Sequence, residues 1–206
     1  MSYLYLTIVF PLIGFLLLAF SRGRWPENIS AIIGVGSIAL SFIVAINAGL
    51  TLLQQPPLEG AYVESLWTWL SVGNFSPAVT LRLDGLSLTL LGVVSGVGFL
   101  IHLFASWYMR GDEGYSRFFA YMNLFVASML LLILADDLVI LFFGWEGVGL
   151  CSYLLIGFYY RDPKNGAAAM KAFIVTRVGD VLMLIGLFIL FREFGTLHIQ
   201  TLLQLA

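Results

Sequence analysis

The sequence predicts an all-α membrane protein of about six transmembrane helices, with one short β-hairpin in a loop. Three observations predict this fold. The 206 residues are 60% hydrophobic and only 11% charged, with a mean hydropathy of +0.97. Soluble domains carry about a quarter charged residues, so a soluble fold would leave more apolar surface than one core could bury. The apolar residues also form runs of membrane-spanning length, and most prolines lie between those runs.

The helical runs follow one another as expected of a multi-pass chain. At 1.5 Å of rise per residue, each is long enough to cross roughly 30 Å of hydrocarbon. Five of the six prolines lie between runs, and only Pro11 lies inside one, where it should kink or loosen the helix. The predicted helices cover about residues 4–20, 29–53, 86–107, 118–135, 138–159 and 172–191.

The one long loop, residues 54–84, has a pattern of its own. Its second half, VESLWTWLSVGNFSPAVTLRL, alternates apolar and polar residues and has a turn signal at Gly73-Asn74. This pattern predicts a short β-hairpin lying on the outer face of the membrane. Most such loops are connections, so we expect a structured lid without chemistry of its own.

The basic residues predict the orientation. Seven of the ten Lys and Arg residues fall in the breaks after the first, third and fifth helices, whereas Arg82 and Arg192 fall on the opposite side. By the positive-inside rule, both termini lie outside and the basic breaks face the cytoplasm. The seven residues are Arg22, Arg24, Arg110, Arg117, Arg161, Lys164 and Lys171.

Three ionisable residues lie well inside predicted spans. Glu146 is in the fifth run, and Arg177 and Asp180 are in the sixth. A charge at this depth costs several kcal/mol, so it normally faces protein or water and normally has a function. Arg177 and Asp180 are three residues apart and share a helix face. Glu146 shares its face with small and aromatic residues (Gly149, Tyr153 and Gly157), which indicates a side that packs against protein.

Two interpretations of these charges remain open. Burial favours the protonated form of a carboxylate, whereas a nearby guanidinium favours the ionised form, so a movable Arg177 would make Glu146 or Asp180 a proton relay. Alternatively, Arg177 and Asp180 form a static pair that fixes helix packing, with a neighbouring hydroxyl or indole capping Glu146. Trp145, beside Glu146, is unusual because most Trp and Tyr residues lie near span ends.

Two further residues are candidates for proton delivery. Lys171 is placed at the end of the sixth helix, where it can extend to the interface without any such role. His102 lies near the basic end of the third helix. A hydrogen-bonded packing histidine accounts for His102 equally simply, and proton delivery is the alternative.

Several other functions are excluded by what the sequence lacks. Cys151 is the only cysteine, which leaves no internal disulfide and no cysteine-based cluster. There is no glycine-rich phosphate loop and no histidine pair at metal-ligand spacing, so we expect no metal, flavin, nicotinamide or haem site in this chain. No basic patch alternates with aromatic residues, so nucleic acid is not expected as a partner.

Two long stretches resemble a known family. The stretch from LDGLSLTLLGVVSGVGFLIHLFASWYMRGDEGYSRFFAYMNLFVASMLLLILADDL to GWEGVGLCSYLLIGFYYRDPKNGAAAMKAFIVTRVGD is similar to the L-type subunits of bacterial NADH:quinone oxidoreductase (respiratory complex I), the equivalents of mitochondrial subunit 5. FPLIGFLLLAFSRGRW is similar to the start of those subunits. The likeness therefore covers essentially the whole chain.

The resemblance implies an antiporter-like subunit that translocates protons in the bacterial inner membrane. The family's functional glutamate falls on Glu146, and its aspartate and arginine fall on Asp180 and Arg177. Residues 1–110 then hold three lead-in helices and the outer loop, and residues 111–206 hold the first three helices of an antiporter-like bundle. The family's glutamate works against a lysine on a later helix, so we expect the N-terminal part of a longer subunit.

The resemblance also implies partners and cofactors. Other membrane subunits of the complex, the M-type antiporter-like subunit above all, are the expected partners, together with lipid and protons. NADH, flavin, iron–sulfur clusters and quinone are expected on partner subunits, so this chain is part of an enzyme, a translocase, without a redox centre of its own. The alternatives are a related cation/proton antiporter or hydrogenase membrane subunit, and a non-transporting scaffold.

Overall fold

The computed structural model describes residues 3–58, 60–73 and 75–205, and within them the predicted helical fold with one hairpin is confirmed. Five helices, α2 to α6, are long and apolar enough to cross a membrane, and α1 is a shorter apolar helix. The helices are α1 (Leu6–Ser21), α2 (Glu27–Gln54), α3 (Gly85–Tyr108), α4 (Tyr115–Leu134), α5 (Leu138–Ile156), α6 (Pro163–Phe194) and α7 (Ile199–Leu205). The strands are β1 (Tyr62–Thr68) and β2 (Ala78–Leu83).

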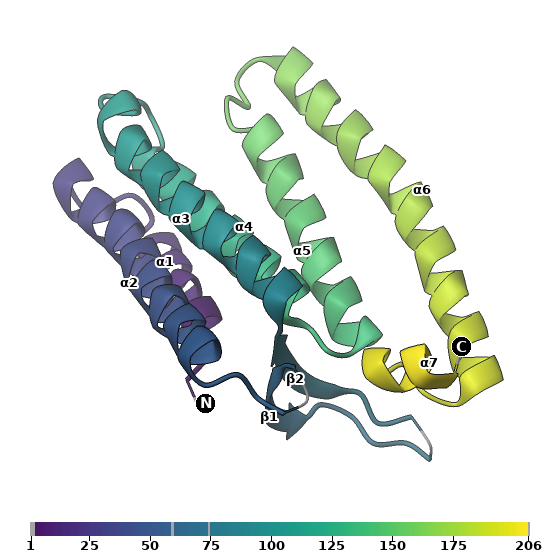
Figure 1. Ribbon diagram of the computed structural model, residues 1–206. Coiled ribbons are helices and arrows are strands. Elements are labelled where there is room, and N and C mark those ends of the chain that lie inside the picture. The colour runs from purple at the N-terminus through teal and green to yellow at the C-terminus, as the bar shows by residue number, and fades with distance from the viewer. Residues whose placement is uncertain (1–2, 59, 74, 206) are drawn as a thin grey trace.

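Helix α4 lies at the centre of the bundle. It packs against α1, α2, α3 and α5, whereas α6 lies at the edge and packs along α5 (Figure 1). A buried amide joins α4 to α2, since Asn123 accepts a hydrogen bond from Ser37 at 2.5 Å and donates one to the Gly34 carbonyl at 3.3 Å. Satisfied polar contacts of this kind hold helices together where lipid offers no partner.

Glycines set the close approach of α5 to α4. A Cβ on Gly144 would stand 2.7 Å from the backbone nitrogen of Leu132, and one on Gly147 would stand 2.6 Å from Ser128 Oγ. Only glycine lets the two backbones lie at this distance, as is usual for small residues between membrane helices. This packing fixes the rotation of α5 and therefore the direction in which its polar residues point.

Helix α6 begins earlier than predicted. It starts at Pro163, nine residues before the expected start at residue 172, and runs for 32 residues. Asp162 caps it by accepting a hydrogen bond from the Lys164 N–H at 2.9 Å. Proline suits the first helical turn because the missing N–H needs no partner there. The polar stretch DPKNG is therefore the start of a helix that is longer than the hydrocarbon is thick, and Lys171 lies two turns inside it.

The hairpin is antiparallel, as predicted, and pairs Tyr62 with Leu83 and Thr68 with Ala78. Gly73 has a positive φ of 57°, in keeping with the predicted turn, and Asn74 lies outside the described residues. At the same end of the bundle, the Asp136 N–H donates to the Thr80 carbonyl and the Ile199 N–H donates to the Asp136 carbonyl, both at 3.0 Å. The hairpin, the α4–α5 linker and the α6–α7 linker are thus tied together (Figure 1). Neither α7 nor this connection was predicted.

Candidate functional site

The three predicted charges meet at the contact between α5 and α6. Glu146 lies about 15 Å along α5 from Ile156, and Asp180 lies about 21 Å along α6 from Phe194. Both carboxylates are therefore well inside their helices. Because α5 and α6 are consecutive and antiparallel, residues near their middles face one another.

Arg177 contacts both carboxylates. It forms an ion pair with Glu146, and its Nη1 lies 3.5 Å from Asp180 Oδ2. Its Nη2 also donates to the Glu146 backbone carbonyl at 3.4 Å, and its guanidinium lies 4.4 Å from the centre of the Phe173 ring. The sequence left open which acid Arg177 would meet, and the structure shows that it meets both.

The sequence marked Trp145 as unusual, but its contact with Asp180 was not predicted. Its indole Nε1 donates to Asp180 Oδ1 at 2.8 Å. The Asp180 side chain is 8% exposed, and each of its oxygens has a partner. Oδ1 contacts Trp145 on α5, and Oδ2 contacts Arg177 on α6. The signal was present in the sequence, because an indole far from the span ends needs a hydrogen-bond acceptor.

The predicted protein-facing side of α5 does face α6. A Cβ on Gly149 would lie 3.7 Å from Arg177 Nη2, so the glycine leaves room for the guanidinium. One turn further, Tyr153 packs on Phe173 with ring centres 5.3 Å apart. These contacts place Arg177 between an aromatic ring and a glycine, with its charged end directed at the acids.

The two delivery candidates lie away from this cluster. Lys171 is exposed on α6, in the helix and not at its end, which corrects its predicted position. His102 is fully buried, and its Nδ1 lies 2.7 Å from the Gly98 carbonyl. His102 Nε2 has no hydrogen-bond partner among the described residues. The structure thus gives His102 the geometry of a packing residue and leaves one ring nitrogen unused.

A second group of titratable residues lies at the end of the bundle that carries the hairpin. Asp136 is buried, and its Oδ2 lies 3.2 Å from His198 Nε2. Burial raises the pKa of Asp136, and the neighbouring His198 and Arg82 oppose that rise. Burial likewise raises the pKa of Asp137, whose Oδ1 accepts a hydrogen bond from the Val139 N–H at 2.8 Å. This group caps α5 and joins α7 to it.

Two family models match the chain. Residues 69–119 match a model described as NADH-Ubiquinone oxidoreductase (complex I), chain 5 N-terminus. Residues 135–206 match one described as NADH:quinone oxidoreductase/Mrp antiporter, TM. The contact between Glu146, Arg177 and Asp180 lies inside the second match, and His102 lies inside the first.

Curated relatives match along the whole chain. NADH-quinone oxidoreductase subunit L of Pseudomonas aeruginosa is 68% identical over 206 residues, which is 100% of this chain and 34% of the relative. The protein of the same name from Escherichia coli K12 is 64% identical over 206 residues, 100% of this chain and 33% of the relative. The one from Mycobacterium tuberculosis is 42% identical over 195 residues, covering 95% and 31%. The chain therefore spans about a third of the length of the curated relatives it matches.

Proposed function

We propose that the chain is part of a proton-translocating, antiporter-like membrane subunit of NADH-quinone oxidoreductase, because it is similar over its whole length to about a third of the L-type subunits of that complex. The observation that carries the proposal is the position of Arg177 between Glu146 and Asp180. Two acids that share one cation inside a membrane span have the composition of a proton-transfer site.

In this proposal Glu146 is the group that changes its protonation. While Arg177 pairs with Glu146, the carboxylate stays ionised, because the guanidinium offsets the cost of burial. If Arg177 moves toward Asp180, Glu146 keeps its low-dielectric surroundings and loses its cation, so it takes up a proton. When Arg177 returns, the proton is released.

Trp145 and Asp180 make that movement reversible. The Trp145 indole holds one oxygen of Asp180, so Asp180 stays in place as the second partner of Arg177. Lys171 and His102 remain the candidates for bringing protons to Glu146. For His102, the unused Nε2 is the atom that favours such a role.

The setting of the subunit is part of the proposal. Four arginines lie in the linkers that follow α1, α3 and α5, and Arg117 lies in the first turn of α4 at the same end of the bundle. We place that end in the cytoplasm, with the N-terminus outside and the chain in the inner membrane. NADH, flavin, iron–sulfur clusters and quinone belong to partner subunits, and the M-type subunit is the nearest partner. The names of the relatives support only the coarser part of this setting, a place among the subunits of a multi-subunit oxidoreductase.

The test is Glu146→Gln in the assembled complex, with Glu113→Gln as the matched control. Glu113 is an exposed acid paired with Arg161, far from any span centre. We expect Glu146→Gln to lower the rate of proton pumping into inside-out vesicles about tenfold or more. A positioned acid or base accelerates a proton-transfer step by at least that factor. The amount of assembled complex, and the rate at which it oxidises NADH with an artificial electron acceptor, should be unchanged. Wild-type pumping by Glu146→Gln would contradict the proposal.

One alternative has a specific observation in its favour. The description of the model that matches residues 135–206 names an Mrp antiporter beside the oxidoreductase. A cation/proton antiporter would transport protons in response to sodium or potassium gradients in the absence of NADH. If the chain were only a scaffold, neutral substitutions at Glu146, Arg177 and Asp180 would not change proton transport directly. The most that they could impair is assembly of the complex. Measurements of NADH-driven pumping, cation-driven proton transport and assembly in the same vesicles therefore distinguish the three functions.

A further inference from the structure

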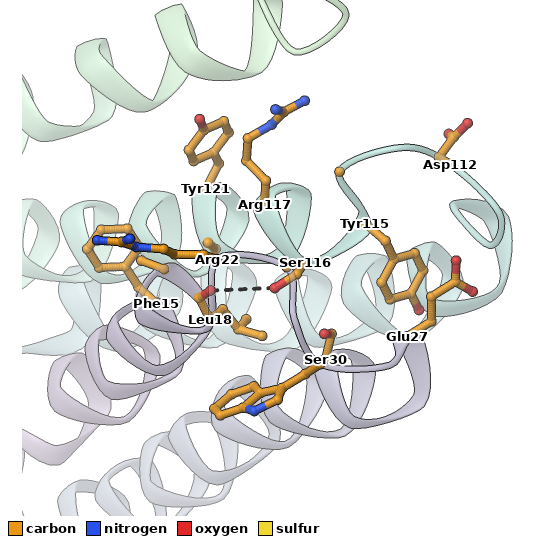
Figure 2. A pocket seen from close by; sticks show the side chains of 15 residues that line it. Phe15, Leu18, Arg22, Glu27, Ser30, Asp112, Tyr115, Ser116, Arg117 and Tyr121 are labelled. Atoms are coloured by element: carbon orange, nitrogen blue, oxygen red, sulfur yellow. Dashed lines mark hydrogen bonds between the residues drawn. The ribbon is translucent and has the colours of Figure 1, made fainter.

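A cavity of about 610 Å³ lies at the arginine-rich end of the bundle, away from Glu146 (Figure 2). Its walls come from the end of α1, the start of α2 and the start of α4. Helix α1 has 16 residues and ends where Arg22 adopts a left-handed conformation, whereas α2 has 28 residues. At 1.5 Å per residue α1 is about 24 Å long, shorter than the hydrocarbon layer. The short helix leaves a hollow at the level of lipid headgroups.

The two signs of charge stand on different sides of this cavity. Figure 2 shows Arg22 and Arg117 on one side and Glu27 and Asp112 on the other. Within the described residues, neither arginine has a carboxylate oxygen within 4.0 Å. Arg22 is thus available to an anion that enters from outside the protein. Arg117 donates from Nη2 to the Phe158 carbonyl at 3.3 Å and keeps its other N–H groups for such an anion.

The acids and the arginines are held in place by other contacts. Glu27 Oε1 accepts a hydrogen bond from the Gly111 N–H at 3.0 Å, and Asp112 Oδ2 accepts one from the Tyr159 hydroxyl at 2.9 Å. The Arg117 guanidinium lies 5.0 Å from the centre of the Phe158 ring. The charged groups are therefore positioned by the fold before any ligand binds.

The floor of the cavity holds a hydroxyl without a partner. Ser30 is fully buried, and its Oγ makes no hydrogen bond among the described residues. Figure 2 shows Ser30 directed toward the space between Ser116 and Tyr115. A buried hydroxyl is almost always hydrogen-bonded in a native protein, so an unpartnered one in a cavity wall indicates a missing acceptor. A phosphate oxygen is such an acceptor.

The surroundings indicate a lipid. Trp25 lines the cavity, and tryptophan is enriched at the level of headgroups. The outward face of α1 that adjoins the cavity-lining residues Phe15 and Ala19 is apolar and exposed, with Leu12 and Leu16 on it. A molecule that places a phosphate in the cavity can thus lay acyl chains along α1. Basic pockets between membrane helices are known to accept phospholipid headgroups.

We propose that this cavity binds the headgroup of a phospholipid that carries a phosphate and a primary ammonium. The phosphate is bound by Arg22, Arg117 and the Ser30 hydroxyl, and the ammonium faces Glu27 and Asp112. The acyl chains lie on the outward face of α1. The cavity has as many acids as arginines, which suits a headgroup without net charge.

The test uses the protein in its assembled complex, reconstituted in liposomes with a photoactivatable phosphatidylethanolamine that carries its reactive group near the glycerol. We expect labelling of peptides covering residues 15–30 and 112–121. The double variant Arg22→Gln/Ser30→Ala should lower this labelling about tenfold, since it removes one charge and the unpartnered hydroxyl. Arg24→Gln is the matched control, because Arg24 lies in the same linker and does not line the cavity. Equal labelling of the double variant and the control would overturn the proposal.

Two further arms identify the ligand. A phosphatidylglycerol probe of the same design should label the peptides less than the phosphatidylethanolamine probe, because it offers no ammonium to the acids. Equal or stronger labelling by it would overturn the assignment of the ammonium. Excess inorganic phosphate should leave labelling unchanged. If it abolishes labelling, the cavity is a site for free phosphate and the lipid proposal is wrong.

Discussion

Helices α4 and α6 are held in the protein in different ways. In the most apolar part of α4, 39% of the residues are buried, against 11% in α6. Helix α4 is surrounded by α1, α2, α3 and α5 and is fixed by apolar packing, by close backbone approach and by the uncharged Asn123 amide. Helix α6 packs along α5, where the polar contacts are those of Arg177 and Trp145. The comparison teaches that the residues proposed to move protons also attach their helix to the bundle.

The largest effect on the difference between α4 and α6 should come from removing the Arg177 guanidinium, which Glu146 and Asp180 share. Arg177→Met leaves Glu146 and Asp180 without their guanidinium. Breaking a buried ion pair from one side costs about 3–5 kcal/mol, and this cost is an upper bound here because Arg177 and Glu146 are partly buried. We expect α6 to separate from α5 first, seen as faster amide hydrogen exchange in α6 than in α4. The triple variant Glu146→Gln/Arg177→Met/Asp180→Asn has no unpaired charge and should recover most of the loss. Equal exchange in α6 of wild type and Arg177→Met would show that apolar contacts hold α6.

Packing against α4 is tested by Gly144→Ala. The added Cβ would meet the Leu132 backbone, which cannot move aside as a side chain can, so we expect a loss of about 2 kcal/mol in the free energy of unfolding. The buried Cys151 thiol on the same helix reports the change as a faster reaction with a maleimide. Gly179→Ala on α6 is the control, since nothing lies within 4 Å of its added Cβ. It should be neutral or stabilising by up to about 1 kcal/mol.

A smaller effect is expected from Trp145→Phe. The substitution keeps a ring in place and removes the hydrogen bond to Asp180, and a bond to a charged group is worth about 1.5 kcal/mol. Unfolding in detergent measures the change. In the proposed mechanism Asp180 becomes free to rotate, so proton pumping should fall while the complex remains assembled. Unchanged pumping would restrict Trp145 to a packing role.

The smallest effect concerns pH and the start of α5, which Asp137 caps. Burial raises the pKa of Asp137 in the folded state, so its contribution to stability is fully present below its unfolded value of about 3.9 and is lost as pH rises through the folded value. Asp137→Asn keeps an acceptor for the Val139 N–H and removes the titration. Unfolding measured between pH 4 and pH 8 should then fall less steeply with pH than in wild type. A steeper fall would contradict the assigned direction.

The sequence was sufficient for most of the helices, because lipid leaves the backbone no alternative to internal hydrogen bonding. The sequence also singled out Glu146, Arg177 and Asp180, because charges in apolar runs are rare and costly. The structure brings these three residues together, and their role in proton transfer stays a prediction. Alternation of apolar and polar residues likewise identified the hairpin.

Other features depend on contacts that a single sequence does not show. The start of α6 was placed too late because DPKNG has the composition of a turn, although Asp162 and Pro163 also fit the start of a helix. The bond from Trp145 to Asp180 depends on how α5 is rotated, which Gly144 sets through its contact with α4. The meeting of His198 with Asp136 depends on the path of the chain after α6.

The connection between the linkers has a mechanical consequence for α6. Its last turn leads into residues that are hydrogen-bonded to Asp136 and Leu138, so this end acts as a fulcrum. Along the helix, Asp180 lies about 21 Å and Pro163 about 47 Å from Phe194. Any tilt about the fulcrum moves the arginine-rich end more than twice as far as the acid. A tilt of α6 about this end would therefore produce a large displacement at Pro163 and a smaller one at Asp180.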